Sequence, residues 1–233
     1  MKTSLLILAF CATIFLASCD STTETTAPPK LAGKGSVFTY SRTDFDADDN
    51  LVDTGTTTYT IDSANMTIET KNDMMRAVSM DDTIYFDYDD SGMHIYRPAV
   101  PIFQNFTLPA IWQDVKAEAN TNSVTKGTYS AETIINGAPA TVTGMDREQY
   151  VGTTVITLNG KTYNAFSKSF TVEVNVSVPS FGVEAKTTIT VTYTFAPDLG
   201  FFMATSDLRT TDSEFSPIQP GRTELALKSY TIE

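Results

Sequence analysis

Few of the side chains that perform chemistry in proteins occur in this sequence. Its 233 residues include two cysteines, one tryptophan and one histidine, His94. One histidine excludes a multi-histidine metal centre, and two cysteines are too few for a cysteine-based zinc site. No Gly-x-Ser-x-Gly elbow or reactive cysteine accompanies His94, so a catalytic triad is not expected. The glycines form no phosphate-binding loop, and the sequence therefore predicts no cofactor.

Basic residues are also scarce. Sixteen lysines and arginines stand against 28 aspartates and glutamates, which gives a net charge of −12. Such an acidic chain cannot neutralise the phosphates of a nucleic acid, and anionic lipid head groups repel it. Paired carboxylates are one remaining route to catalysis, as in glycosidases, but 28 acidic residues guarantee chance pairs. We therefore expect a non-enzymatic protein with no nucleic-acid partner.

The first 18 residues have the pattern of a secretory signal. Lys2 is its basic start, and residues 5–16 are an apolar run too short for a membrane span. The run ends in Leu16-Ala17-Ser18-Cys19, which resembles the lipobox of bacterial lipoproteins. This resemblance implies cleavage before Cys19 and acylation of the Cys19 thiol and amino group, with palmitate as a typical chain. An ordinary signal with an incidental cysteine is the alternative.

Lipidation at Cys19 would place the protein in the bacterial cell envelope, at the inner or the outer membrane, with its domain outside the cytoplasm. Each buried methylene of an acyl chain contributes about 0.8 kcal/mol, so two or three chains form a lasting anchor. Residues 19–34 then form a flexible tether rich in threonine and proline. Residues 35–233 contain no fixed repeat and no internal linker, and we expect them to form a single domain.

Apolar and polar residues alternate with a period of two through much of this domain. The alternation is longest over residues 170–178 and 188–195, with turn residues at 179–182 between them. Asn159-Gly160 is typical of a type I′ hairpin turn. Similar runs recur every 8–12 residues or so, which is typical of all-β domains. The sequence predicts an all-β, antiparallel curved sheet, a half-barrel or barrel, with at most one short helix.

Prolines interrupt the alternation between residues 98 and 122. Pro109 could open the one credible helix, over residues 109–118, with Ile111 and Val115 on one side. The rest of this segment is apolar but irregular. It fits either a plug packed on the sheet or a mobile lid, and a packed plug is the commoner case.

Aspartates gather in two expected turns. Residues 44–50 begin like an EF-hand calcium loop but lack its glycine at the sixth position and its glutamate at the twelfth. Asp87, Asp89 and Ser91 are weak calcium candidates, because Pro98 takes the twelfth position of their motif. Aspartate, asparagine and glycine are also ordinary hairpin residues. Structural turns are therefore the favoured interpretation, and we expect no metal.

Three segments resemble motifs of a group of uncharacterised bacterial envelope lipoproteins. They are an opening strand at residues 35–40, a glycine-bearing turn at 160–166, and a Tyr-x-Phe-Ala-Pro-x-x-Gly run at 193–200. Such proteins are similar in outline to the LolA/LolB type of periplasmic lipoprotein carrier. In that type a curved antiparallel sheet accepts acyl chains on its concave apolar face. The resemblance implies an apolar ligand or lipid in the concavity of the sheet.

The leading hypothesis is a lipid-anchored, non-enzymatic envelope protein that binds an apolar ligand or lipid. The expected apolar face consists of Phe106, Trp112, Val172, Val174, Val176, Ile189, Val191 and Tyr193. These residues could equally form a dry core, because half-buried strands need such faces in any case. The alternative function is a surface interaction module that binds protein or glycan through acidic loops. A continuous apolar cavity would favour the first function, and exposed aromatic residues at loop tips would favour the second.

Overall fold

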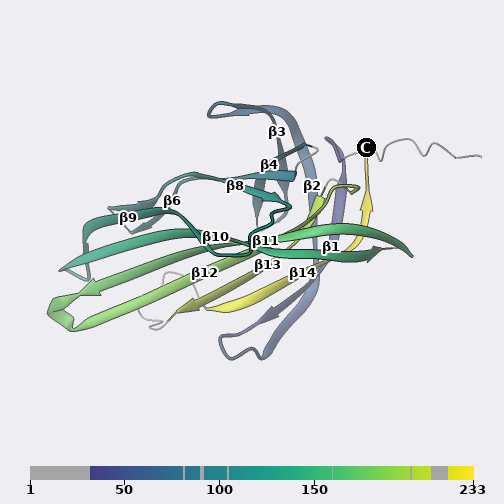
Figure 1. Cartoon of the computed structure of the whole chain (residues 1–233). Helices are drawn as coiled ribbons and strands as arrows, with labels where there is room; N and C mark the ends of the chain where they lie inside the picture. Colours follow the sequence, from purple (N-terminus) through teal and green to yellow (C-terminus); the bar gives the residue numbers. More distant parts are fainter. Residues whose placement is uncertain are drawn as a thin grey trace, which may run out of the picture.

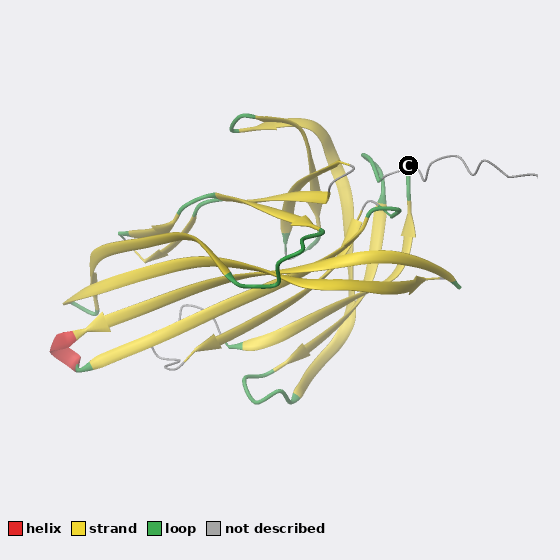
Figure 2. Ribbon diagram, in the orientation of Figure 1, coloured by secondary structure: helices red, strands yellow, loops and turns green. Residues whose placement is uncertain are grey.

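The computed structural model describes residues 32–80, 82–89, 92–103, 105–158, 160–199, 201–210 and 220–233. The expected signal, Cys19 and Ser91 lie outside these residues. The described part consists of β-strands and one 3₁₀ helix (Figure 2). In chain order the elements are β1 (Val37–Phe45), β2 (Leu51–Ile68), β3 (Lys71–Val78), β4 (Thr83–Asp89), β5 (Gly92–Arg97), β6 (Val100–Phe103), β7 (Phe106–Leu108), β8 (Ile111–Lys116), β9 (Val124–Ile135), β10 (Ala138–Leu158), β11 (Lys161–Val178), η1 (Pro179–Phe181), β12 (Val183–Ala196), β13 (Phe201–Thr210) and β14 (Gly221–Thr231).

Twelve of the strands form one antiparallel sheet in the order β8-β5-β4-β3-β2-β1-β14-β13-β12-β11-β10-β9. The ladder between β13 and β14 is short, because only residues 205–208 pair with residues 221–224. On one side of this junction, the seven strands from β8 to β14 curl into a half-barrel. On the other side, the strands from β13 to β9 are long and run across it (Figure 1). The predicted all-β, curved antiparallel fold is confirmed.

The β11–β12 hairpin follows directly from the sequence alternation. Val172, Val174 and Val176 are each less than 9% exposed and lie on the inner face of β11. On the opposite face, hydroxyl groups pair across the two strands, with Ser169 Oγ 2.6 Å from Thr192 Oγ1. Gly182 follows η1 with a positive φ of 66°, which glycine adopts without strain, and it completes the predicted turn.

The half-barrel is filled from its open side by aromatic residues of the long strands. Phe170 of β11 and Phe195 of β12 belong to the same core cluster as Phe38, Ile61 and Phe86 of the half-barrel. The concave face is therefore largely packed rather than empty, and its core is built from strands far apart in the sequence.

The β6–β7 hairpin is a plug. Phe106 and Leu108 of β7 are 2% and 3% exposed and pack on the inner faces of β10 and β11. A Cβ atom on Gly144 of β10 would lie 3.0 Å from Cζ of Phe106, so the glycine permits this close approach without a shift of the plug. Of the two interpretations that the sequence left open, the structure supports the packed plug.

One local prediction was wrong. Residues 111–116 form strand β8 rather than a helix, because pairing with β5 gives their backbone groups partners and buries Gln113 and Val115. The turn between β2 and β3 lies at residues 69–70, and β3 begins at Lys71. β10 is a single strand of 21 residues. In the described part of the chain, no helix is long and apolar enough to cross a membrane.

Candidate functional site

Two adjoining cavities lie between the half-barrel and β12. The first, which we call the apolar cavity, has a volume of about 320 Å³. The second, the polar cavity, has a volume of about 350 Å³. Both are bounded by Asp82, Ile84, Val191 and Tyr193. Because they share these residues, the two cavities are neighbours along β4 and β12.

Aliphatic and aromatic side chains dominate the lining of the apolar cavity. They come from the half-barrel, from the β6–β7 plug and from the β11–β12 hairpin, so three parts of the fold must assemble to form it. The apolar members are Ile84, Ile95, Val100, Ile102, Leu108, Phe170, Val172, Ile189, Val191 and Tyr193, with Pro98 beside them.

The structure divides the residues of the expected apolar face into three groups. Four of them, Val172, Ile189, Val191 and Tyr193, line the apolar cavity. Three others, Phe106, Val174 and Val176, do not line the cavity and lie in the buried cluster around the plug, to which Val172 also belongs.

Trp112 lies away from the cavity, which corrects its expected position on the apolar face. Because β8 is a strand, its side chains alternate, and Gln113 and Val115 point inward while Trp112 points outward. The indole ring packs against Tyr96 with centroids 4.9 Å apart, and its Nε1–H donates to Glu69 Oε2 at 3.2 Å. Lys71 Nζ lies 4.5 Å from the ring centroid. This aromatic cluster stabilises the outer surface of β5 and β8.

Two polar side chains that sequence reasoning missed line the apolar cavity. Gln113 of β8 is only 8% exposed, and it belongs to the lining of this cavity. Arg97 at the end of β5 also lines the cavity, and its Nε–H is buried without an acceptor in the described part of the chain. An unsatisfied buried polar group costs about 1–3 kcal/mol, so each such group needs an explanation.

The other nitrogens of Arg97 are fully engaged. Nη1 and Nη2 donate to the two carboxylate oxygens of Asp146 at 2.7 and 2.9 Å, and Nη2 also donates to the Pro109 carbonyl at 3.1 Å. Tyr129 donates its hydroxyl proton to Asp146 Oδ2 at 2.6 Å. Burial raises the pKa of Tyr129 to about 12, and the hydrogen bond to the ionised Asp146 adds to the rise. The charge of Arg97 is therefore balanced before any ligand arrives.

A second ion cluster joins β9, β10 and β11 to the loop after β8. Lys168 of β11 is 1% exposed, and its Nζ lies 2.6 Å from Glu118 and 3.2 Å from Glu148. Lys126 also contacts Glu148, at 3.2 Å. These groups satisfy one another and do not line either cavity, which indicates that they hold the loop after β8 against the long strands.

Two of the weak calcium candidates, Asp87 and Asp89, lie beside His94, the only histidine. His94 Nδ1 lies 2.7 Å from Asp114 Oδ1, and Nε2 lies 3.4 Å from Asp89 Oδ2. Burial raises the pKa of Asp87, which lines a shallow hollow together with Asp89 and His94. Among the residues that the structure describes, no group of three or more histidine, cysteine, aspartate or glutamate side chains could hold a metal ion. The geometry therefore favours hydrogen bonding between strands over metal binding.

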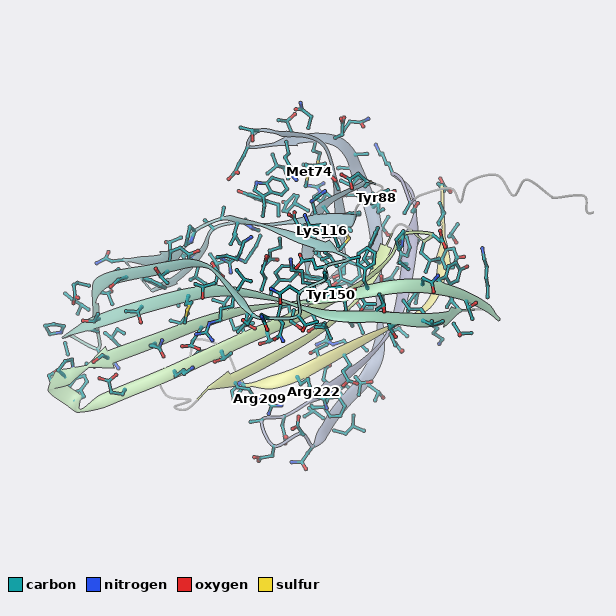
Figure 3. The ribbon with its side chains drawn as sticks, in the orientation of Figure 1. Met74, Tyr88, Lys116, Tyr150, Arg209 and Arg222 are labelled. Atoms are coloured by element: carbon teal, nitrogen blue, oxygen red, sulfur yellow. The ribbon has the colours of Figure 1, made fainter. Side chains whose placement is uncertain are left out.

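The acidic loop at residues 44–50 is organised by its own contacts. Asp46 Oδ1 accepts hydrogen bonds from the backbone N–H groups of Asp48 and Asn50, both at 2.9 Å. Arg209 and Arg222 lie side by side near this loop (Figure 3), and both donate to Asp49 Oδ1. Hydrogen bonds from these two arginines hold the pKa of Asp49 below its usual value. Much of the negative charge of the loop is thus neutralised within the molecule.

Comparison with known proteins gives no relative on which to base the function. No protein-family model, no curated protein and no solved structure matches this chain significantly. The apolar cavity is therefore the feature from which a function must be argued.

Proposed function

We propose that this protein is a lipid-anchored protein of the bacterial cell envelope that binds an apolar ligand or lipid in the apolar cavity. The observation that carries the binding proposal is a cavity of about 320 Å³ lined mainly by aliphatic and aromatic side chains. This volume is at the lower end of the range for small-molecule sites, which are typically apolar with a few polar groups. The adjoining polar cavity would extend the site along β12.

The proposed anchor rests on the sequence at residues 16–19, and the structure describes the chain from Ala32 onward. Ala32 is 1% exposed, and its carbonyl accepts a hydrogen bond from the Tyr88 hydroxyl. The nearby Ser36 Oγ accepts hydrogen bonds from the backbone N–H groups of Gly33 and Glu233, both at 3.1 Å. The tether would thus leave the domain beside the C-terminus, at the end of the molecule opposite η1 (Figure 2).

A surface interaction module is the second candidate, and one observation favours it. Phe181 of η1 is 53% exposed at the tip of the β11–β12 hairpin, where it would face away from the membrane. Exposed apolar residues at a loop tip are candidates for contact with a partner. The acidic loop at residues 44–50 is less suited to this role, because arginines of the same chain already bind Asp49.

Mass spectrometry tests the binding proposal. The full-length protein is expressed in a bacterial host, released with detergent, and examined by native mass spectrometry and solvent extraction. We expect an apolar molecule to accompany the protein, and its amount to fall sharply in Val191→Trp, which fills the cavity. An empty protein that is also unchanged by added lipid would refute ligand binding and favour the interaction module.

Labelling with radioactive palmitate tests the anchor separately. The wild-type chain should incorporate label and remain with the membrane fraction. Cys19→Ser should do neither, whereas Cys11→Ser, the matched control within the signal, should behave like the wild type. Equal labelling of Cys19→Ser and the wild type would contradict lipidation at Cys19.

A further inference from the structure

The charged side chains around the two cavities do not balance one another. Among the described residues, the charged members of the two linings are Arg42, Asp82 and Arg97. Arg97 is paired with Asp146, and Arg42 Nε lies 2.8 Å from Asp44 Oδ2. Both cationic side chains of the lining therefore already have a carboxylate partner within this chain.

Asp82 is the acidic residue that both cavities share. Its Oδ1 accepts a hydrogen bond from the Thr83 backbone N–H at 2.7 Å, and its Oδ2 accepts one from the Tyr59 hydroxyl at 3.2 Å. A carboxylate has about four acceptor sites, so these two bonds leave room for a further donor. Within the described part of the chain, no lysine, arginine or histidine forms an ion pair with Asp82. Asp82 is also exposed, so a ligand can reach it.

The neighbouring tyrosines do not alter this charge. Tyr59 and Tyr193 both line the polar cavity. Burial raises the pKa of each phenol, and the negative charge of Asp82 adds to the rise. Both hydroxyl groups therefore stay protonated and uncharged at neutral pH. The uncompensated charge in the described lining of the cavities is consequently the negative charge of Asp82.

This charge lies beside an apolar surface that can hold a hydrocarbon chain. Asp82 belongs to both linings together with Ile84, Val191 and Tyr193. A ligand whose chain occupies the apolar cavity can therefore place its head group next to the carboxylate. An ammonium head group would gain a charge-assisted hydrogen bond there. A carboxylate head group would be repelled by Asp82, because the arginines of the lining are already paired.

We propose that the two cavities select an amphiphile whose hydrocarbon chain lies in the apolar cavity and whose cationic ammonium head group pairs with Asp82. The inference rests on the proposed function, because it assigns the ligand class of the same site. It makes Asp82 the residue that determines specificity, while the aliphatic lining supplies most of the affinity.

Three ligands with matched chains test this inference on the full-length protein in a non-ionic detergent. Dodecylammonium, dodecanol and laurate would each displace a fluorescent apolar dye at neutral pH, and their displacement constants would be compared. We expect dodecylammonium to bind roughly three- to tenfold more tightly than dodecanol, the gain expected of a partly exposed charged contact. This advantage should shrink as salt is added. Laurate should bind more weakly than dodecanol.

Variants of Asp82 distinguish a specific pair from the general attraction of an acidic protein for cations, since the chain has a net charge of −12. Asp82→Asn should lower the ratio of dodecylammonium to dodecanol affinity roughly threefold or more without weakening dodecanol. Asp53→Asn is the matched control and should leave the ratio nearly unaltered. Asp53 is exposed, lines neither cavity and likewise accepts a hydrogen bond from the next backbone N–H, at 2.8 Å. Asp82→Ser keeps an acceptor for the Tyr59 hydroxyl, so it serves if the asparagine variant does not fold.

The outcomes separate this inference from the proposed function. If the Asp82 and Asp53 variants change the ratio equally, or neither changes it, the pair with Asp82 is overturned, while displacement of the dye by dodecanol leaves the apolar ligand proposal standing. Laurate binding more tightly than dodecanol would also overturn the preference for a cation. If none of the three ligands displaces the dye, both proposals fail.

Discussion

Arg97 at the end of β5 and Asp146 in the middle of β10 form a two-pronged ion pair, with N–O distances of 2.7 and 2.9 Å. The two strands are not neighbours in the sheet, and the residues are 49 positions apart in the chain. The pair therefore connects β5 and β10 through side chains, because no backbone ladder joins these two strands. A buried ion pair adds little net stability relative to apolar packing, but it penalises any arrangement that separates the two charges.

Removing one charge of this pair should destabilise the fold strongly. Asp146 is 4% exposed, so Asp146→Asn leaves the Arg97 guanidinium without its counterion. We expect the free energy of unfolding in urea to fall by about 3–5 kcal/mol, the range for breaking a buried pair. Asp62→Asn is the matched control, because its pair with Arg76 has both side chains 37% exposed. Asp62→Asn should change the unfolding free energy far less. Equal effects of the two variants would contradict a special role for the Arg97–Asp146 pair.

Gly144 should accept no side chain without disturbing the plug. A Cβ atom there would lie 3.0 Å from Phe106 Cζ and 3.3 Å from Leu108 Cδ2. Gly144→Ala should lower the free energy of unfolding by about 1–3 kcal/mol, because the plug must shift away from β10. At Gly55, a Cβ atom would have no neighbour within 4 Å, so Gly55→Ala should be neutral or stabilising. Chemical denaturation of both variants checks the opposite signs, and a stable Gly144→Ala would show that the plug is not tightly packed.

Local pattern was enough to predict the long hairpins but not the cavity. Val172 and Val174 have the same neighbours in the alternation and both belong to the buried cluster around the plug, yet only Val172 also lines the apolar cavity. Which of two equivalent inward positions borders the cavity depends on where the β6–β7 hairpin packs. That packing is a tertiary contact with no signature in the sequence of β11 itself.

The polar part of the site was missed for a different reason. Pro109 indicated a helix over residues 109–118, and a helix gives no reason for Gln113 to point into a sheet concavity. Residues 111–116 are recognised as a strand only when their pairing with β5 is known. A strand pattern tested on residues 111–116 would have placed Gln113 and Val115 on one face, and this is the signal that could have identified Gln113.

Buried tyrosines should make the fold sensitive to alkaline pH. Burial raises the pKa of Tyr59 to about 12, and the nearby Asp82 carboxylate adds to the rise. The unfolded chain loses this proton near the ordinary pKa of about 10, so it binds fewer protons than the native state above that pH. The contribution is fully present below pH 10 and is lost as the pH rises towards 12. Its slope is at most about 1.4 kcal/mol per pH unit.

Urea unfolding of the wild type and Tyr59→Phe between pH 8 and pH 11.5 measures this effect. Tyr59→Phe should be the less stable protein at pH 8, because it lacks the hydrogen bond to Asp82. Its stability should then decline less steeply than that of the wild type above pH 10. Parallel declines in the two proteins would exclude Tyr59 as a source of the alkaline sensitivity.

Filling the cavity should abolish ligand binding without unfolding the protein. Val191 borders both cavities, so an indole ring at this position can occupy existing space rather than displace packed neighbours. We expect Val191→Trp to lose most of its binding of a fluorescent apolar dye while its unfolding midpoint falls only modestly, since overpacking typically costs about 1–3 kcal/mol.

Val155→Trp provides the control for that experiment, because Val155 is 61% exposed on β10 and lines neither cavity. It should bind the dye as the wild type does. If Val191→Trp also binds normally, the dye must bind elsewhere, and the cavities beside Val191 would not be the ligand site. If Val191→Trp unfolds instead, the space beside Val191 is needed for packing, and the dry-core interpretation would extend to the whole inner face of β12.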